Sequence, residues 1–413
     1  MKILVLTERF LPEITAPSFR TMDHARLWLA DGHEVTVVTC VPNFPRGQVF
    51  PGYHKRFYQE EIIDGVRVVR IWSYMTANEG LVRRTFDYIS YMLSAVAFAR
   101  RYPNFDVLLA TSPPFFTAIA GWLVASLRQR PWVFEIRDLW PASIRAVGAS
   151  SSRALDMLEK LELFLYRRAD RIISLTCSFK RDLVCRGIPA DKNDVVTNAV
   201  DFDQFSRSRV TVNARERLGV PNDAFLAGYV GTTGMAHGLE TMLDAAEKCL
   251  DDSRLRFLIM GEGAERVNLE AAAKRRGLSN VIFHDFVSHD QVPSYLAALD
   301  VSIVHLRPDP VFKTVIPSKI FENMAMGVPM IMAVEGEAAE IVREAGAGLC
   351  VPSGNGSIMA DTVRRLADNA RLLDEMGRRG REAVEAHYTR RANAKSCIHS
   401  FEAAIASYRE RRR

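Results

Sequence analysis

The most constraining feature of this sequence is an alternation of strand and helix patterns that runs through the first half of the chain and then starts again. Short apolar, β-branched runs alternate with segments of helical periodicity, and turn residues separate them. The strands we expect lie at residues 2–6, 34–40, 106–110, 132–136 and 171–175, then at 225–230, 256–260, 280–283, 301–304 and 329–333. The helices expected in the first half lie at residues 19–30, 83–101, 152–168 and 177–186, and a short hairpin is expected at 62–72 around Asp64 and Gly65. This alternation predicts parallel βαβ units in doubly wound sheets.

Two such patterns predict two Rossmann-like α/β domains, and a chain of 413 residues is also too long for one ordinary core. Turn residues and a charge cluster near 198–210 separate the two patterns. We therefore place the first domain at residues 1–198 and the second at 199–387, and expect a final helix at about 388–413 to pack back on the first. Ligands of such sheets bind at the carboxyl ends of the strands, so we expect the site in a crevice between the domains.

The segment Pro-Ser-Lys-Ile-Phe-Glu-Asn-Met-Ala-Met-Gly-Val-Pro at 317–329 carries the strongest functional signal. It follows a loop and reads as the first turns of a helix, whose N-terminal N–H groups and partial positive charge can hold a phosphate. Lys319 adds a full charge, and Glu322 is placed to accept hydrogen bonds from a ribose. The pattern fits a nucleotide diphosphate. The alternative is an amphipathic helix with a capping Ser318 and a solvated lysine and glutamate.

Two glycine turns each follow a predicted strand. Gly231-Thr232-Thr233-Gly234 precedes a helix, and Gly261-Glu262-Gly263 follows the next strand. Neither has the Gly-x-Gly-x-x-Gly spacing or a Walker Lys-Ser/Thr pair, which argues against a dehydrogenase and a P-loop kinase. Glycines still let the backbone approach a phosphorylated ligand closely, although plain turn chemistry is the alternative for each.

Charge and composition indicate a soluble globular protein, with 48% hydrophobic and 25% charged residues. The net charge of +5 lies wholly in the first 200 residues, which hold 26 Lys+Arg against 20 Asp+Glu. That excess favours an anionic partner such as a membrane surface or a phosphorylated acceptor. The helix at 83–101 has arginine pairs around an apolar stretch and could lie in a membrane interface or be a core helix. No run is long enough to span a membrane, and the six scattered cysteines fit a reducing cytosol.

Together these motifs resemble the retaining glycosyltransferases of family four, which have the GT-B fold. The resemblance covers nearly the whole chain, from the Pro12-Glu13 loop through Thr-Asn-Ala-Val-Asp at 197–201 to Ala-x-Gly-x-Pro at 325–329. Within the family the chain looks most like the WbuB-type L-fucosaminyltransferases of O-antigen, capsule and exopolysaccharide assembly. The marks of that branch are Val-Pro-Asn-Phe-Pro-Arg-Gly at 41–47, Pro-Gly-Tyr at 51–53, Ile-Asp-Gly-Val at 63–66, Asp-Leu-Trp-Pro at 138–141 and Pro-Ser-Lys at 317–319.

The resemblance implies a UDP-sugar donor bound by the second domain and a polyprenyl-diphosphate-linked saccharide bound by the first, at the inner face of the cytoplasmic membrane. It implies a cytoplasmic, peripheral membrane protein that uses no cofactor and no metal, and no nucleic acid partner. The donor residues it implies are Gly231, Thr232, Gly234, Gly261, Ser318, Lys319 and Glu322. Asp138 is the catalytic candidate, able to orient the acceptor or take its proton, and Glu13 and Arg20 are the acceptor-binding candidates. For Asp138 a helix N-cap or a partner for Arg137 is the alternative; for Glu13 it is a surface turn.

The chain departs from the family pattern in ways that affect the site. The family glutamate eight positions before Glu322 is Thr314 here, and the glycine loop has Met235 and His237 near the places of an arginine and a lysine. The family's active-site histidine is replaced by Arg137. Alternatives to a transferase are therefore a GT-B nucleotide-sugar epimerase or phosphorylase and a non-catalytic nucleotide-sugar-binding protein.

Overall fold

The structure is a computed structural model that describes residues 1–77, 81–139 and 153–413. Contacts divide the chain into two compact units. Unit 1 comprises residues 1–197 and 390–413, and unit 2 comprises residues 198–389. The units therefore begin and end within a few residues of the predicted domain bounds. Trp140 and Pro141 of the motif at 138–141 lie outside the described residues.

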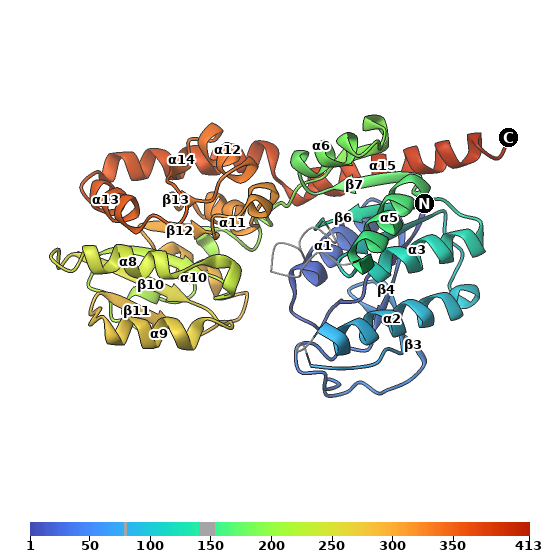
Figure 1. Cartoon of the computed structure of the whole chain (residues 1–413), viewed down its shortest axis with the longest axis horizontal. Coiled ribbons are helices and arrows are strands. Elements are labelled where there is room, and N and C mark those ends of the chain that lie inside the picture. The colour runs from blue at the N-terminus through green and yellow to red at the C-terminus, as the bar shows by residue number, and fades with distance from the viewer. Residues whose placement is uncertain (78–80, 140–152) are drawn as a thin grey trace. The chain divides into compact units, whose positions relative to one another are not determined.

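Unit 1 is built on an eight-stranded sheet with strand order β3-β4-β2-β1-β5-β6-β7-β8 (Figure 1). Its strands are β1 (Lys2–Leu6), β2 (Glu34–Cys40), β3 (Tyr58–Ile63), β4 (Val66–Ile71), β5 (Val107–Ser112), β6 (Trp132–Ile136), β7 (Arg171–Ser174) and β8 (Asn193–Val195). All neighbours are parallel except β3 and β4, which form the hairpin predicted around Asp64 and Gly65. Both turn residues have positive φ, as a tight hairpin turn requires.

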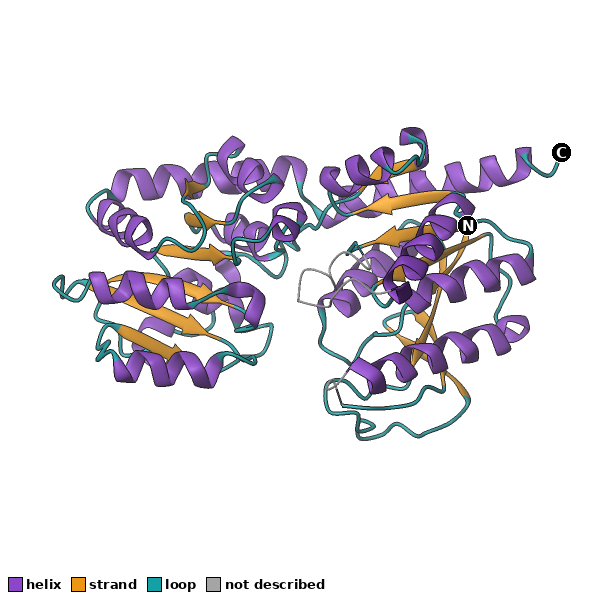
Figure 2. Ribbon diagram, in the orientation of Figure 1, coloured by secondary structure: helices purple, strands orange, loops and turns teal. Residues whose placement is uncertain are grey.

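Helices cover both faces of this sheet (Figure 2). They are α1 (Ala16–Ala30), α2 (Leu81–Ala97), α3 (Phe115–Arg128), α5 (Arg153–Arg168), α6 (Cys177–Cys185) and α15 (Arg390–Glu410). The buried strand β1 shows why two layers are needed: Leu4 and Leu6 pack in one core cluster, while Ile3 and Val5 pack in the other. Successive side chains of a strand point to opposite faces, so a strand that is apolar throughout needs cover on both.

The final helix α15 packs against α1 in unit 1. Trp28 of α1 is 1% exposed, donates from its indole Nε1 to the carbonyl oxygen of Ala394 at 3.0 Å, and meets the ring of Phe401 edge-on. A hydrogen-bonded buried tryptophan of this kind fixes the position of the helix.

Unit 2 contains a six-stranded parallel sheet with order β11-β10-β9-β12-β13-β14. Its strands are β9 (Phe225–Val230), β10 (Leu255–Met260), β11 (Val281–His284), β12 (Val301–His305), β13 (Met330–Ala333) and β14 (Gly348–Cys350). Its helices are α7 (Ala214–Arg217), α8 (Glu240–Lys248), α9 (Arg266–Arg275), α10 (Val292–Ala298), α11 (Lys319–Met326), α12 (Glu337–Glu344), α13 (Gly356–Ala367) and α14 (Ala370–His387). The predicted doubly wound α/β architecture is confirmed in both units. Among the described residues, no helix is long and apolar enough to cross a bilayer.

Candidate active site

The two glycine loops of unit 2 pack directly on each other at the carboxyl ends of β9 and β10. The N–H of Gly231 donates to the carbonyl of Met260 at 2.9 Å, and that of Thr233 donates to the carbonyl of Glu262 at 2.9 Å. A Cβ added at Gly261 would clash with the carbonyl oxygen of Gly231. Gly231 and Gly261 also have φ values of 142° and 131°, which L side chains rarely adopt. Gly261 therefore serves the close approach of the two loops.

Lys319 reaches from the first residue of α11 to the first glycine loop. A Cβ built on Gly231 would lie 2.7 Å from the Lys319 Nζ, so glycine leaves room for the ammonium group there. The Nζ lies 3.7 Å from the centre of the Tyr229 ring, and the hydroxyl of Tyr229 donates to the carbonyl of Thr232 at 2.7 Å. The contact holds the cation over an aromatic face beside the loop.

The ammonium group of Lys319 is buried and has no hydrogen-bond partner among the described residues. Burial lowers its pKa to about 7, although the carboxylate of Glu322 opposes that shift. A buried cation without a hydrogen-bonded anion is costly, because it has lost water and the aromatic face and the charge of Glu322 offset that loss only in part. The arrangement is what a site for an anionic ligand requires. The solvated lysine of the alternative interpretation is wrong.

The N-terminus of α11 adds backbone donors to this cation. Ser318 stands at the N-cap in a helical conformation and its exposed side chain makes no capping hydrogen bond, so the capping serine of the alternative interpretation is also wrong. The N–H groups of Ile320 and Phe321 donate to the carbonyls of Pro317 and Ser318 at 3.2 and 3.1 Å, and among the described residues no hydrogen bond is recorded for the N–H groups of Ser318 and Lys319. Glu322 is partly buried and lies three residues after Lys319, in the first turn of the helix.

The glycine loop offers fewer free N–H groups than its sequence indicates. Gly231 and Thr233 already donate to the second loop, and the N–H of Gly234 donates to Nδ1 of His237 at 3.3 Å. Among the described residues, Thr232 alone in this loop has an N–H for which no hydrogen bond is recorded. The N–H of Gly234 is therefore occupied by a histidine in this structure.

His237 and His305 hold the first glycine loop, residues 231–234, in place through hydrogen bonds. Burial, and after it the charge of Lys319, lowers the pKa of His237 to about 4, so its ring is neutral and its Nδ1 can accept. His305, 2% exposed, lies 2.6 Å through Nδ1 from the carbonyl oxygen of His237 and accepts the N–H of Gly354 at its Nε2, at 3.2 Å. Sequence reasoning missed His305 and Tyr229, because their roles depend on contacts between distant segments.

Arg266 is a third residue that the sequence did not point to. It is 7% exposed, and its Nη1 donates to the carbonyl oxygens of Ile259, Gly261 and His284 at 2.9–3.2 Å. These bonds hold the second glycine loop against the ends of β10 and β11. An arginine in the first turn of a helix after a glycine turn is the signal that could have identified it.

Thr314 occupies the place of the family glutamate and closes a local turn. Its hydroxyl donates to the carbonyl of Val311 at 2.8 Å within the 3₁₀ helix Pro310–Thr314. It therefore cannot supply the carboxylate contact to a donor sugar that the family pattern implies.

The acceptor-side candidate Glu13 is buried in unit 1. It is 1% exposed, and its Oε1 accepts the backbone N–H groups of Asn43 and Phe44, each at 2.8 Å. The surface-turn alternative for Glu13 is wrong, because the carboxylate holds the 41–47 loop beside β2. The neighbouring Glu8 is also buried, and burial raises its pKa to about 8 despite the opposing charge of Arg9.

Arg20 is committed to internal bonds. Its Nε donates to Glu135 at 3.0 Å, and its Nη1 and Nη2 donate to the carbonyls of Thr197 and Val196 at 2.9 and 3.1 Å. With all three nitrogens engaged, Arg20 ties α1 to β6 and to the end of β8. These internal hydrogen bonds account for the presence of Arg20 without any contact to an acceptor substrate.

Asp138 lies two residues beyond β6 and is partly buried. Arg137 beside it has a pKa lowered to about 10 by burial, with Glu135 opposing the shift. Among the described residues, no three His, Cys, Asp or Glu side chains gather as a metal site would need.

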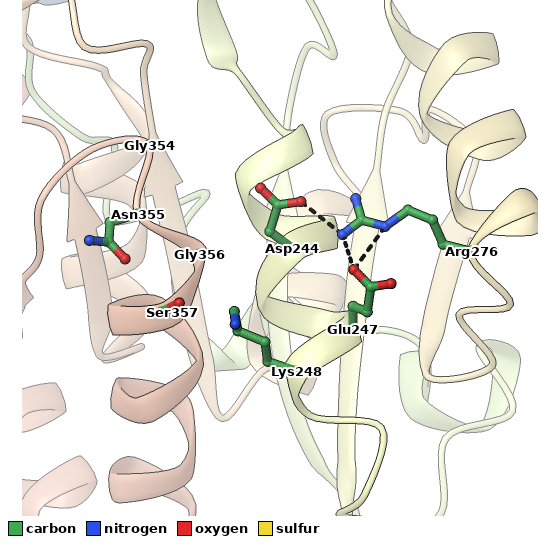
Figure 3. A pocket seen from close by; sticks show the side chains of 8 residues that line it. All are labelled: Asp244, Glu247, Lys248, Arg276, Gly354, Asn355, Gly356 and Ser357. Carbon is green, nitrogen blue, oxygen red and sulfur yellow. Dashed lines mark hydrogen bonds and ion pairs between the residues drawn. The ribbon is translucent and has the colours of Figure 1, made fainter.

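A groove of about 570 Å³ elsewhere in unit 2 is not part of this site. It lies between α8 and the loop that starts α13, and its residues include Asp244, Glu247 and Arg276 (Figure 3). Arg276 donates to Asp244 at 2.8 Å and also pairs with Glu247, so these charges are matched within the groove. None of its lining residues belongs to the glycine loops or to α11.

Comparison with known proteins identifies the class. Residues 15–199 match the glycosyl transferase 4-like domain, and residues 224–369 match glycosyl transferases group 1. These two domains cover most of the chain, and the chain belongs to this glycosyltransferase family with the two-domain GT-B fold. Its two domains and its relatives named as glycosyltransferases identify it as a transferase enzyme.

Particular relatives extend the comparison. The Escherichia coli (strain K12) protein assigned to colanic acid biosynthesis as glycosyl transferase WcaI is 26% identical over 344 residues, covering 81% of this chain and 84% of that protein. The 2-deoxystreptamine N-acetyl-D-glucosaminyltransferase of Streptomyces fradiae is 28% identical over 377 residues, covering 86% of each. Among solved structures, Anabaena Alr3699/HepE in complex with UDP-glucose has a TM-score of 0.72 at 17% identity, covering 97% of this chain and 99% of that one.

Proposed function

We propose that this glycosyltransferase transfers a sugar, with retention of configuration, from a UDP-sugar to a lipid-linked saccharide in bacterial surface polysaccharide synthesis. The observation that carries the proposal is the buried, unpartnered ammonium of Lys319 between Gly231 and the Tyr229 ring. The diphosphate of a nucleotide sugar supplies the missing anion. The likeness to a protein solved with UDP-glucose supports a uridine nucleotide.

In this proposal unit 2 binds the donor. The ammonium of Lys319 and the N–H groups of Ser318, Lys319 and Thr232 face the diphosphate. Glu322 accepts hydrogen bonds from the ribose hydroxyls. Charge grows on UDP as the glycosidic bond breaks, and a positioned cation with fixed N–H donors stabilises that charge without reorganisation. The chemistry of leaving-group departure thus needs no metal ion or cofactor.

In the same proposal unit 1 binds the acceptor, and Asp138 orients the acceptor hydroxyl or takes its proton. Glu13 acts through the 41–47 loop that it holds, and Arg20 acts through the β6 end that it ties to α1. Both are then positioning residues for the acceptor site.

The donor sugar we propose is an N-acetylated amino sugar such as N-acetyl-L-fucosamine, as in the WbuB-type branch. The motifs at 41–47, 51–53, 63–66, 138–141 and 317–319 support that branch. The relative that transfers N-acetyl-D-glucosamine supports an N-acetylated donor more generally, and the relative assigned to colanic acid synthesis supports a surface polysaccharide.

We further propose that the protein is cytoplasmic and contacts the inner membrane through α2. Three apolar side chains on this helix are exposed, whereas Tyr91 and Ala95 of the same helix are buried: Val82 at 68%, Phe86 at 60% and Leu93 at 60%. Arginines lie at both ends of the segment, at 83–84 and 100–101. An apolar stripe with flanking arginines suits the interface between headgroups and acyl chains.

The experiment that tests the function is a donor panel with UDP release as readout. The protein is incubated with UDP-N-acetyl-L-fucosamine, UDP-N-acetylglucosamine and UDP-glucose, each with and without a polyprenyl-diphosphate-linked sugar. We expect release with an N-acetylated donor only when the acceptor is present. Failure of every lipid-linked acceptor, or release with a non-acetylated donor alone, would contradict the proposed substrates.

A further inference from the structure

A pocket in unit 1 gathers four arginines at the edge of the sheet away from the candidate catalytic residue. It has a volume of about 350 Å³ and lies between the residues that precede β5 and β6 and the last turns of α15. Its arginines are Arg130, Arg409, Arg412 and Arg413, and all four are exposed. Asp106 and Pro131 place it at the amino ends of the strands. Asp138 follows the other end of β6, which at about 3.3 Å per residue spans roughly 16 Å.

These arginines differ from their neighbours in having no carboxylate partner among the described residues. Nearby arginines have internal roles: Arg128 donates to the carbonyl oxygens of Ala99 and Tyr102 at 2.7 and 2.9 Å, and Arg411 pairs with Asp170. No such ion pair is recorded for the four pocket arginines within the described part of the chain. Like charges collected in one pocket repel one another, so their convergence indicates a missing anion.

Part of the pocket is held in place before any ligand arrives. The Nη2 of Arg412 donates to Oε1 of Gln129 at 3.0 Å, and its guanidinium lies over the Tyr408 ring, 5.5 Å from the centroid. Gln129 ends α3 with a φ of 52°, in the left-handed region that usually favours glycine. The side chain at this strained position is the one that holds Arg412.

The charge of the pocket stays positive after its local negative groups are counted. Asp106 contributes one carboxylate, whose Oδ2 already accepts the backbone N–H of Lys2 at 2.7 Å. The C-termini of α3 and α15 also end nearby, and each helix end carries roughly half a negative charge. Four arginines against these groups leave about two positive charges. Arginine clusters of this kind suit the oxygens of a phosphate or diphosphate.

We propose that this pocket binds a phosphate-bearing anion at a site separate from the donor site. Ile405 and Tyr408, both partly buried, give it an apolar wall beside the arginines. That combination fits a phosphorylated headgroup attached to an apolar body as well as free diphosphate. The two sources share one recognition chemistry, and separate probes distinguish them.

The test compares two double variants with the same loss of charge. Arg130→Gln/Arg409→Gln removes two pocket arginines, and Arg217→Gln/Arg275→Gln removes two exposed arginines of unit 2 as the control. Binding of inorganic pyrophosphate is measured by calorimetry with UDP at saturation, so that the donor loops are occupied. Flotation with phosphatidylcholine vesicles, with and without phosphatidylglycerol, is measured in parallel. Circular dichroism confirms that both variants are folded.

We expect the pocket variant to bind at least one probe on the order of tenfold more weakly than wild type, while the control variant binds as wild type does. A loss confined to pyrophosphate identifies a free anion as the ligand, and a loss confined to phosphatidylglycerol vesicles identifies a lipid headgroup. If the pocket and control variants bind both probes equally, the proposal is overturned.

Discussion

Lys319 gives the sharpest prediction, because replacing it should stabilise the fold and at the same time abolish the proposed function. Burial takes its pKa from an ordinary 10.5 to about 7. Each pKa unit corresponds to about 1.36 kcal/mol, so burying this group costs the folded state at most about 4 kcal/mol at pH 7. The contact with the Tyr229 ring returns up to about 2 kcal/mol of that cost. We therefore expect Lys319→Met to stabilise unit 2 by about 2 kcal/mol at pH 7, while abolishing sugar transfer.

The pH dependence of that gain follows from the direction of the shift. The folded pKa lies below the unfolded one, so the lysine destabilises the fold fully below pH 7 and progressively less as pH rises to about 10.5. The difference in unfolding free energy between Lys319→Met and wild type should therefore be largest near or below pH 7 and shrink toward pH 10. Other titrating groups are common to both proteins and cancel.

Urea denaturation at pH 7 and pH 10 measures this difference. Circular dichroism reports both units, whereas tryptophan fluorescence reports unit 1 alone, because all five tryptophans precede residue 141. Lys274→Met, at an exposed lysine of α9, is the matched control and should change neither signal. A Lys319→Met protein that is less stable than wild type at pH 7, or whose difference is the same at both pH values, would refute the reasoning. A companion variant, Lys319→Ala, should lower turnover more than UDP affinity; equal losses would indicate uniform binding instead.

Four other outcomes are expected. Glu322→Ala should weaken UDP-sugar binding by about 1.5–3 kcal/mol with the fold intact, and a variant that binds UDP as wild type does would sink the ribose assignment. UDP affinity of wild type should fall as pH rises from 7 to 9, since only protonated Lys319 attracts the diphosphate; calorimetry showing constant affinity would contradict this. Transfer should survive EDTA, and strict dependence on added Mg²⁺ or Mn²⁺ would show that the diphosphate is neutralised differently. Gln at the arginines of the first turn of α2 and of the 3₁₀ turn that follows it should reduce flotation with anionic vesicles and use of a lipid-linked acceptor but spare a water-soluble acceptor; these are Arg83, Arg84, Arg100 and Arg101. Unchanged flotation would make α2 an ordinary core helix.

Periodicity in the sequence was sufficient for the architecture, because each strand needs only local apolar runs to be recognised. Strand β1 and the hairpin at Asp64 and Gly65 show this: a buried run and a two-residue turn are local signals. The placement of Lys319 and Glu322 at a helix start was local information too. Their helix begins at Lys319, as the turn before it and the apolar spacing after it predict.

The parts that sequence reasoning missed depend on long-range contacts. No local sequence pattern shows that His237 accepts a hydrogen bond from the N–H of Gly234. Nor does one show that Arg20 donates to the carbonyls of Val196 and Thr197, which lie 176 and 177 positions further along the chain. Glu13 looked like a loop residue, and only the return of the 43–44 backbone makes it a buried acceptor. A charged residue in a turn has either role until its partners are known.

The departures of this chain from the family pattern change which residue supplies positive charge at the first glycine loop. Where the family has cations on the glycine loop, Met235 is 60% exposed and His237 is neutral at physiological pH. Of the described residues around that loop, Lys319 is then the cation in direct contact with it. Its Nζ is buried without a hydrogen-bond partner and its pKa is lowered to about 7, so under the proposed function a bound diphosphate would raise that pKa and restore the charge. In this proposal the donor supplies the anion that its own site lacks, and the cost of the buried lysine falls when the diphosphate binds.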